Sequence, residues 1–376
     1  MENQSEEKIT GNQPDKKNKK NKKRKGRIAL LIIGIVVLLL IICALAGYLV
    51  FHHYYSLLDY KSASEWESAD ASEYDEDDEY ETSDLEEMSE DDLADLEAEM
   101  EETLKSIATL ETDTYNILLV GVDSRSDTNT GRSDCMILIS VDEEDQRIVM
   151  TSFLRDIYLS IPGYGYNRLN AAFAYGGPDL LESTILANFG ITVDKYVVVN
   201  FYTVMEFIDA VDGVDIEVTA EEIAVMNNYI KSHNSLLGND EDTDIISEDD
   251  AGLLHLNGNQ ALAYARVRYV GTDFARTGRQ REILEKVFEK MKDMSILDMV
   301  DLFEEFFPDI TTDLTEGDFA SLLLMLLDAS SYSLDSMAIP ATGTWSNANI
   351  NGMAVLTIDF QANIDIWYEL VNGDDE

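Results

Sequence analysis

The strongest hydrophobic pattern in the chain is an uninterrupted apolar run from Ile28 to Phe51, which spans 24 residues and carries no charge. A helix of this length would measure about 36 Å at roughly 1.5 Å per residue, enough for a hydrocarbon core of about 30 Å. Nine Lys or Arg lie between Lys16 and Arg27, and acidic residues follow the run. We therefore expect a single-pass protein of the cell membrane, with a cytoplasmic basic tail at 1–27, a transmembrane helix at 28–51 and an extracytoplasmic remainder. A cleaved signal peptide is the alternative, but its apolar region would normally span only about 7–15 residues.

An acidic segment follows at 52–113. Between Glu65 and Glu102 there are 21 Asp or Glu and no Lys or Arg, which is typical of a solvated, self-repelling and largely disordered chain. From Ser83, which forms a capping-box pattern with Glu86, apolar residues recur at near-helical spacing. We expect an extracytoplasmic acidic spacer that is partly helical after residue 83, where the helix either docks on the folded domain or associates with itself.

Apolar runs and helical patterns alternate from residue 114 to residue 376. Continuous apolar runs, typical of strands covered on both faces, occupy 115–122, 135–141 and 147–153, and further strands are expected at 195–201, 214–218, 332–339 and 354–358. Helical patterns occupy 168–175, 178–189, 202–211, 258–268, 276–293, 296–305, 316–328 and 360–371. Residues 228–255 are polar and acidic, and we expect a long excursion there. The alternation indicates one layered α/β/α domain without specifying its strand order.

The formal net charge of −47 excludes one class of partner. An acidic surface repels a phosphate backbone, so we expect no nucleic acid partner. Against this background, five of the ten arginines beyond the first sixty residues lie between Arg266 and Arg281. Guanidinium groups suit bidentate contact with phosphate oxygens at a partly desolvated site. We interpret the stretch as an anion-binding site, and pairing of these arginines with surplus carboxylates is the alternative.

Two carboxylates stand at the ends of predicted strands. Asp123 follows the strand at 115–122 and Asp134 precedes the next strand, so both lie at one edge of the sheet, where open α/β sheets place ligands. With Arg125 and Arg132 beside them, they suit a hard cation such as Mg²⁺ that shares a phosphate-bearing substrate. Two solvated loop acids in a chain with 74 acidic residues would show the same spacing. Arg155 adds a cation at the end of another strand.

Other common active-site chemistries have no support in the sequence. The histidines are His52, His53, His233 and His255, and none is in a setting that suggests a catalytic triad or a zinc site. No glycine-rich phosphate loop occurs at a strand-to-helix junction. Cys43 lies in the predicted span and Cys135 in the folded domain, so the two cannot form a disulfide.

Four blocks of the sequence resemble, in order, the signature blocks of the LytR-CpsA-Psr (LCP) family. They are GVDSRSDTNTGRSD (121–134), FLRD (153–156), LNAAFAYGG (169–177) and ARVRYVGTDFARTGRQR (265–281), within a resemblance that runs from about Thr114 to Asp359. Members are membrane-anchored, extracytoplasmic phosphotransferases, mainly of Gram-positive bacteria. The resemblance implies an LCP-type catalytic domain at 114–376 with a central mixed sheet. It also implies transfer of a glycopolymer, such as teichoic acid or capsule, from a polyprenyl-pyrophosphate carrier to peptidoglycan during cell wall biogenesis.

The resemblance also implies roles for individual residues. The implied catalytic residues are Asp123, Asp134, Arg155, Arg266 and Arg268, with Asp123 and Asp134 holding Mg²⁺. The implied substrate-binding residues are Arg125, Arg132, Asn170, Asp273, Arg276 and Gln280. Asp273 would orient Arg276, and the arginines and Gln280 would hold the pyrophosphate. The segment at 269–272 departs from the longer and often basic segment usual in the family, so one phosphate contact is left unassigned.

In the implied reaction a sugar hydroxyl attacks the phosphorus nearer the polymer, and polyprenyl phosphate leaves. Asp123 or Asp134 would take the hydroxyl proton. Apolar helices within 284–327 would line a hydrophobic groove for the lipid, and ordinary core packing of their side chains is the alternative. A hydrolase that uses water as acceptor at the same site is one alternative, and a non-enzymatic envelope regulator is another. The predicted cytoplasmic tail at 1–27 is too short for a folded DNA-binding domain.

Overall fold

The computed structural model describes residues 52–53, 55–56, 59–60, 85–122, 133–268, 270, 273–327 and 331–373. The chain divides into two units, Met1–Ser56 and Leu57–Glu376, and every element below belongs to the second. The predicted basic tail at 1–27 and transmembrane helix at 28–51 lie outside the described residues. None of the described helices is both long and apolar enough to cross a membrane.

The described strands form a seven-stranded sheet with the order β1-β10-β7-β2-β3-β4-β11. They are β1 (Asp59–Tyr60), β10 (Thr311–Thr312), β7 (Lys195–Asn200), β2 (Tyr115–Val122), β3 (Ser133–Asp142), β4 (Arg147–Phe153) and β11 (Ser333–Ile339). β2, β3 and β4 are antiparallel neighbours, whereas β7 joins β2, and β11 joins β4, in parallel. The expected central mixed sheet is therefore confirmed.

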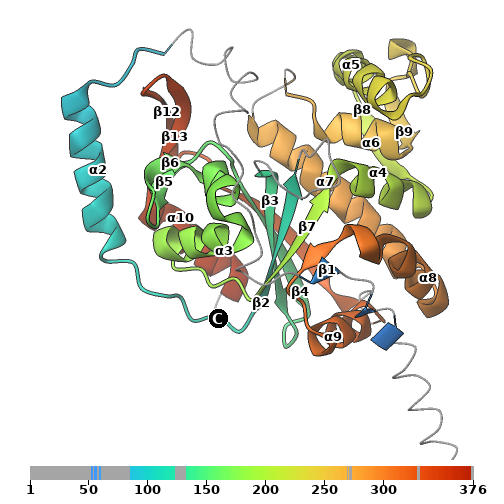
Figure 1. Cartoon of the computed structure of the whole chain (residues 1–376), viewed down its shortest axis with the longest axis horizontal. Coiled ribbons are helices and arrows are strands. Elements are labelled where there is room, and N and C mark those ends of the chain that lie inside the picture. Colours follow the sequence, from blue (N-terminus) through green and yellow to red (C-terminus); the bar gives the residue numbers. More distant parts are fainter. Residues whose placement is uncertain are drawn as a thin grey trace, which may run out of the picture. The chain divides into compact units, whose positions relative to one another are not determined.

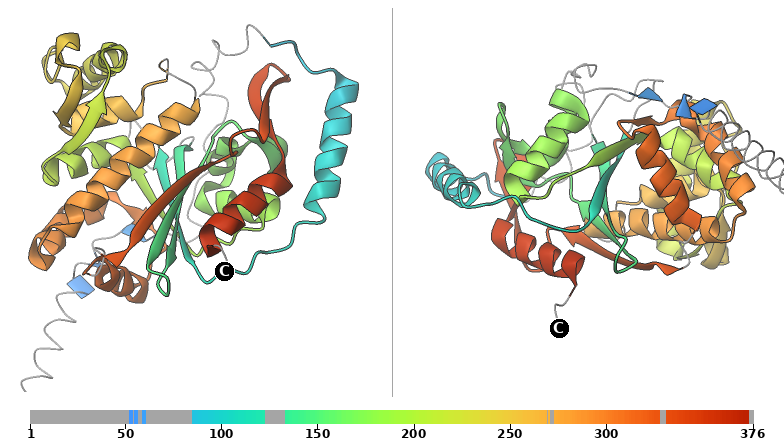
Figure 2. Two further views of the ribbon diagram at one scale, coloured as in Figure 1. Left: turned by 180° about the vertical axis from the view of Figure 1, so that it is seen from behind. Right: turned by 90° about the horizontal axis from the view of Figure 1, so that it is seen from below.

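Alternate residues of β2 pack against different layers of helices. Leu118, Val120 and Val122 belong to a core shared with α3 (Leu169–Phe189) and α10 (Phe360–Asn372). Ile117 faces a cavity that is also lined by α7 (Asp273–Lys292) and α9 (Glu316–Leu327). Figures 1 and 2 show the sheet between these two helical layers. The layered α/β/α architecture is confirmed.

A second apolar cluster lies beside α7 and α8 (Ile296–Phe306). Around it are α4 (Phe201–Ala210), β8 (Val214–Val218), α5 (Ala220–Leu237), β9 (Gly252–Leu256) and α6 (Gly258–Ala265). β8 and β9 pair in a separate two-stranded sheet, so the strand predicted at 214–218 is not part of the central sheet.

The long excursion expected at 228–255 contains regular structure, because α5 and β9 occupy much of it. Thr219 and Glu222 form a capping box that starts α5. The polar composition of this helix is misleading because His233 and Asn234 are buried. His233 Nδ1 lies 2.9 Å from Asn259 Oδ1, and Asn234 Nδ2 donates to the Thr243 carbonyl at 2.7 Å.

Two hairpins and two short 3₁₀ helices are also present among the described residues. β5 (Tyr158–Ile161) pairs with β6 (Gly165–Arg168), and β12 (Trp345–Ile350) pairs with β13 (Met353–Ile358). The 3₁₀ helices are Glu248–Asp250 and Phe307–Asp309. The two helices predicted at 168–175 and 178–189 are the halves of α3, which is kinked at Gly176 and Gly177.

The acidic segment contains helix α2 (Glu90–Leu104), which packs on the folded domain. Its N-cap is Ser89, whose hydroxyl accepts a hydrogen bond from the Asp92 backbone N–H, so the helix does not begin at residue 83. Met100 is buried in the core shared with α3 and α10. The Tyr158 hydroxyl donates to Glu97 Oε1 at 2.8 Å. The apolar face of the helix is therefore covered by its own chain, as in the docked arrangement.

Replacing Met100 with alanine should lower the free energy of unfolding by about 2–3 kcal/mol, because truncation removes apolar contacts and leaves a cavity. Denaturant-induced unfolding measures this change. Glu99→Ala, on the exposed side of α2, is the matched control and should change the free energy by no more than about 0.5 kcal/mol. Equally small effects for both variants would show that α2 does not pack on the domain in solution.

Glu182 of α3 makes the stability of the fold depend on pH. Burial, followed by the charges of Asp313 and Asp179, raises the pKa of Glu182 from 4.5 to about 8. Between these values the folded protein holds a proton that the unfolded chain has released, so stability falls as pH rises through this window.

Glu182→Gln should reduce the fall in Tm between about pH 5 and about pH 8, because glutamine stays uncharged throughout. Thermal unfolding at a series of pH values measures the slope. Glu99→Gln, an exposed change on α2, should keep the parental slope. A parental slope in Glu182→Gln as well would contradict the elevated pKa.

Candidate active site

The arginine-rich stretch begins where helix α6 ends. Arg266 is the C-cap residue of α6. The helix therefore ends at Ala265, three residues before the end of the helical pattern at 258–268. Residues two positions apart on a continuing helix would point to different sides, but Arg266 and Arg268 line one polar cavity of about 420 Å³. Arg276 and Gln280 of α7 and Asp134 of β3 line the same cavity. Side chains from three parts of the chain therefore meet there.

Two aromatic rings position the Arg266 guanidinium. Its Cζ lies 5.3 Å from the ring centroid of Phe201 on α4 and 5.3 Å from that of Tyr229 on α5, and its Nη1 lies 3.4 Å from His233 Nε2. Cation–π contacts of this kind stabilise a partly desolvated guanidinium. The sequence does not single out Phe201 or Tyr229, since the segment that carries Tyr229 lacks an obvious helical pattern.

A chain of ion pairs runs from Asp134 away from this cavity. Arg155 Nη1 lies 3.1 Å from Asp134 Oδ1, and Arg155 Nε lies 3.3 Å from Asp156 Oδ2. Arg168 Nη1 lies 3.5 Å from the other oxygen of Asp156. Arg155, Asp156 and Arg168 are buried, so each charge depends on its partners for stabilisation. No pattern in the sequence marks Arg168, the N-cap residue of α3, as a part of the site.

Asp134 and Asp156, the two carboxylates of these ion pairs, have pKa values that are shifted in opposite directions. Burial alone would raise the pKa of Asp134, but the charges of Arg155, Arg276 and Arg268 outweigh burial and hold its pKa below the usual range. Burial raises the pKa of Asp156, and the opposing charge of Arg155 does not cancel this effect. The carboxylate that faces the arginine cavity is therefore the more strongly anionic of the two.

Arg276 brings hydrogen-bond donors into the cavity from a buried position. Its side chain is 3% exposed, and its Nη2 lies 2.8 Å from Asp273 Oδ1, the pairing that the family resemblance implies. Its Nε and Nη1 have no hydrogen-bond partner among the described residues. Burial lowers the pKa of this guanidinium. Because buried donors without acceptors are costly, an anion in the cavity would stabilise this arrangement.

Arg279 belongs to the same stretch of sequence but has a structural role. Its Nε donates to Glu222 Oε1 at 2.8 Å, and its terminal nitrogens donate to the carbonyls of Val267 and Val270 at 2.9 and 2.6 Å. These bonds fix the segment that carries Arg268 against α7 and the start of α5. The charge pattern alone does not distinguish Arg279 from the arginines that line the cavity.

The remaining predicted site residues lie behind the cavity or outside the described ranges. Asn170, at the start of α3, is buried, and its backbone N–H donates to the Arg155 carbonyl at 3.2 Å. Its Oδ1 has no donor among the described residues, and no cavity-lining role is observed for it. Asp123, Arg125 and Arg132 lie outside the described residues, so their predicted roles remain predictions.

The polar cavity borders apolar cavities. A small cavity of about 80 Å³ shares Phe201, Arg266 and Gln280 with it. Leu284 of α7 lines both this small cavity and a third one, of about 320 Å³, between the sheet and α7 and α9. The third cavity is almost wholly apolar, with Ile117, Ile139, Val197, Val287, Phe288, Met291, Phe319 and Met325 among its lining residues.

Of the two carboxylates predicted to hold Mg²⁺, Asp134 lies among the described residues. The described residues contain no group of three or more His, Cys, Asp or Glu side chains that could hold a metal ion. Mg²⁺ is commonly held by one or two carboxylates together with substrate phosphates. Asp134, anionic and beside a cavity suited to phosphate, fits such a site.

The family model described as LytR_cpsA_psr matches residues 74–371 of this chain, a range that includes α2. Polyisoprenyl-teichoic acid--peptidoglycan teichoic acid transferase TagU of Oceanobacillus iheyensis is 28% identical over 274 residues, which are 70% of this chain and 73% of TagU. The corresponding transferase TagT of Bacillus subtilis is 30% identical over 210 residues, 54% of this chain and 62% of TagT. A solved structure of TagT bound to LIIa-WTA aligns with a TM-score of 0.55 and 25% identity, covering 71% of this chain and 93% of that one. The family match, the fold and the arginine cavity agree, and the chain belongs to the LytR-CpsA-Psr family.

Proposed function

We propose that this protein is a phosphotransferase that moves a glycopolymer of the teichoic acid class from a polyprenyl-pyrophosphate carrier to peptidoglycan. The observation that carries this proposal is that an arginine-lined cavity and an apolar cavity beneath α7 each share lining residues with one small cavity between them. A ligand with an anionic head and a long apolar chain matches both. The activity named for the TagU relative supports the same assignment.

The pyrophosphate would bind to Arg266, Arg268 and Arg276. These side chains point into one cavity from α6, the segment after it and α7. Arg276 has buried donors without partners among the described residues, and a phosphate oxygen would satisfy them. Planar guanidinium groups can contact two phosphate oxygens at once, so the cluster can hold the head group in one orientation.

The lipid would extend from this head group through the small cavity and along the inner face of α7. Leu284, Val287, Phe288 and Met291 of α7 line the apolar path. Burying a prenyl chain there removes apolar surface from water at roughly 25 cal/mol per Å². Most of the affinity for the carrier would therefore come from the lipid, and its orientation from the arginines.

In the proposed reaction an acceptor sugar hydroxyl attacks the phosphorus nearer the polymer. The new P–O bond forms as the bond to the bridging oxygen breaks, the hydroxyl proton passes to a base, and polyprenyl phosphate leaves. Negative charge grows on the bridging oxygen. The guanidiniums of Arg266 and Arg276, already held by aromatic rings and by Asp273, can stabilise this charge without reorganising.

We also propose Mg²⁺ as a cofactor and 28–51 as a membrane anchor. When bound, Mg²⁺ would neutralise part of the phosphate charge, and Asp134 would hold it together with Asp123. The anchor would keep the domain on the extracytoplasmic side of the membrane that contains the carrier. The position of Asp134, ion-paired with Arg155 and lining the arginine cavity, supports the first proposal. The 24-residue apolar run supports the second.

Incubating the full-length protein with a lipid-pyrophosphate-linked oligosaccharide, peptidoglycan fragments and Mg²⁺ should give the oligosaccharide joined to the fragment through a phosphate, together with lipid monophosphate. Chromatography with mass spectrometry identifies both products. Chelation of the metal, or Asp134→Asn, should lower turnover by orders of magnitude. Release of free oligosaccharide phosphate without any joined product would favour the hydrolase alternative, and normal turnover of Asp134→Asn at low Mg²⁺ would exclude Asp134 as a ligand.

Arg268→Lys keeps the positive charge but removes the paired N–H donors, so lipid-substrate turnover should fall by about ten- to a hundredfold. Steady-state kinetics with the lipid-linked donor measures the loss. Arg147→Lys is the control, because Arg147 lies at the other end of β4 from Arg155 and donates to the Val371 carbonyl of α10. Parental turnover in both variants would mean that Arg268 contributes only positive potential.

A further inference from the structure

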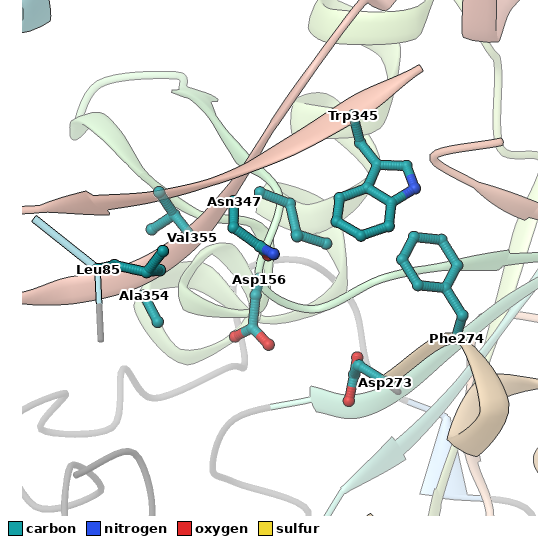
Figure 3. A pocket seen from close by; sticks show the side chains of 9 residues that line it. Leu85, Asp156, Asp273, Phe274, Trp345, Asn347, Ala354 and Val355 are labelled. Carbon is teal, nitrogen blue, oxygen red and sulfur yellow. The ribbon is translucent and has the colours of Figure 1, made fainter. Parts of the chain in front are cut away.

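A second polar hollow lies on the far side of the ion pairs from the arginine cavity. It has a volume of about 310 Å³ and shares no lining residue with the arginine cavity. Figure 3 shows that Asp156, Asp273 and Phe274 approach it from one side and that Trp345 and Asn347, on the β12–β13 hairpin, approach it from the other. The volume falls within the range of about 300–1,000 Å³ typical of small-ligand sites.

The lining of this hollow matches the chemistry of a sugar. Phe274 and Trp345 stack on each other with their ring centroids 4.8 Å apart and an interplanar angle of 28°. Both rings line the hollow, and this stacked pair, the aromatic wall, gives it an apolar surface for C–H groups. The polar side chains of the lining, from Asp156, Asp273 and Asn347, can all accept hydrogen bonds from hydroxyls. A phosphate would be repelled by the two carboxylates, so the hollow does not duplicate the arginine cavity.

The carboxylates of the hollow do not require a cationic ligand. Asp156 is paired with Arg155 and Arg168, and Asp273 is paired with Arg276. Asp273 Oδ2 is nevertheless buried without a hydrogen-bond partner among the described residues. A neutral O–H donor would satisfy this oxygen without adding a charge.

The hollow is held in a fixed shape by the segment before α2. The Met88 backbone N–H donates to the Asn349 carbonyl at 2.8 Å, and Asn349 Nδ2 donates to the Leu85 carbonyl at 3.3 Å. Leu85 also lines the hollow. The hairpin is therefore tied to the same segment that begins the docked helix, and the aromatic wall is preorganised.

Arg155 and Arg276 connect the two cavities. Arg155 contacts Asp134 of the arginine cavity and Asp156 of the hollow, and Arg276 lines the arginine cavity while pairing with Asp273 of the hollow. The apolar path leaves the arginine cavity elsewhere, beside Phe201. Phosphoryl transfer places the attacking and leaving oxygens on opposite sides of phosphorus, so a hydroxyl in the hollow is suited to attack and a lipid in the apolar path is suited to leave.

We propose that the hollow between Phe274 and the β12–β13 hairpin is a carbohydrate subsite that holds the acceptor sugar of a peptidoglycan glycan strand, with Asp273 as a positioning residue for the attacking hydroxyl. The identity of this sugar rests on the proposed transferase function. The carbohydrate subsite itself rests on the aromatic wall, on the bridging arginines and on the Asp273 oxygen that has no hydrogen-bond partner among the described residues.

Kinetics with two lining variants test the proposal on the full-length protein. Ala354→Leu places bulk in the hollow and should raise the KM for a soluble peptidoglycan glycan fragment by about tenfold or more. Asn347→Ala, an exposed lining change, should raise it by about two- to tenfold through the loss of a hydrogen bond. The KM for the lipid-linked donor should stay within about twofold in both. Ser346→Leu adds similar bulk at an exposed position of β12 that does not line the hollow, and should leave both constants unchanged.

Calorimetric binding of the same glycan fragment, without donor, separates this proposal from the proposed function. If the parent protein binds the fragment and Ala354→Leu binds it more weakly, the subsite is supported. This holds even if no transfer is detected, and then only the proposed function fails. An increase in donor KM instead of acceptor KM would assign the hollow to the sugar of the carrier and overturn the acceptor assignment. Unchanged acceptor KM and unchanged glycan binding in both lining variants would overturn the subsite.

Discussion

The buried guanidiniums of Arg155 and Arg276 hold the site together. Arg155 is paired with Asp134 of the arginine cavity and with Asp156 of the hollow, and Arg276 is paired with Asp273 of its own helix. Both arginines are at least nine-tenths buried. Losing one partner of a buried ion pair leaves an uncompensated charge and costs about 3–5 kcal/mol. The loop after β4, the start of β3 and the start of α7 must therefore stay in register for the site to exist. The same two arginines separate a cavity suited to phosphate from a hollow suited to a sugar.

The alternation of β2 divides the molecule into a stabilising side and a binding side. Its even-numbered residues from Leu118 to Val122 are buried in the core with α3 and α10, and Ile117 and Leu119 face the apolar cavities beneath α7 and α4. A shift of one residue in strand pairing would exchange these two sets. The cavities can thus remain open because the opposite face of the sheet supplies a large core.

The sequence predicts what depends on local pattern and misses what depends on topology. β2 and β4 have the bounds that their apolar runs predict, since strands covered on both faces are distinct in composition. The ion pair of Asp273 with Arg276 is also local, because residues three apart on a helix are neighbours. The partnership of Arg168 with Asp156 requires the β5–β6 hairpin to bring the chain back, and no local pattern marks it. Tyr229 was hidden for another reason, because α5 buries polar residues that make its sequence look solvated.

A structure of the protein with a bound polyprenyl pyrophosphate is the most direct test of the proposed head-group site and lipid path. Phosphate oxygens should lie within hydrogen-bonding distance of Arg266, Arg268 and the Nε and Nη1 donors of Arg276, with the prenyl chain between the sheet and α7. The hollow beside Trp345 should stay free of phosphate. A pyrophosphate bound in that hollow, or a prenyl chain lying outside the cavity beneath α7, would contradict the proposed site and path.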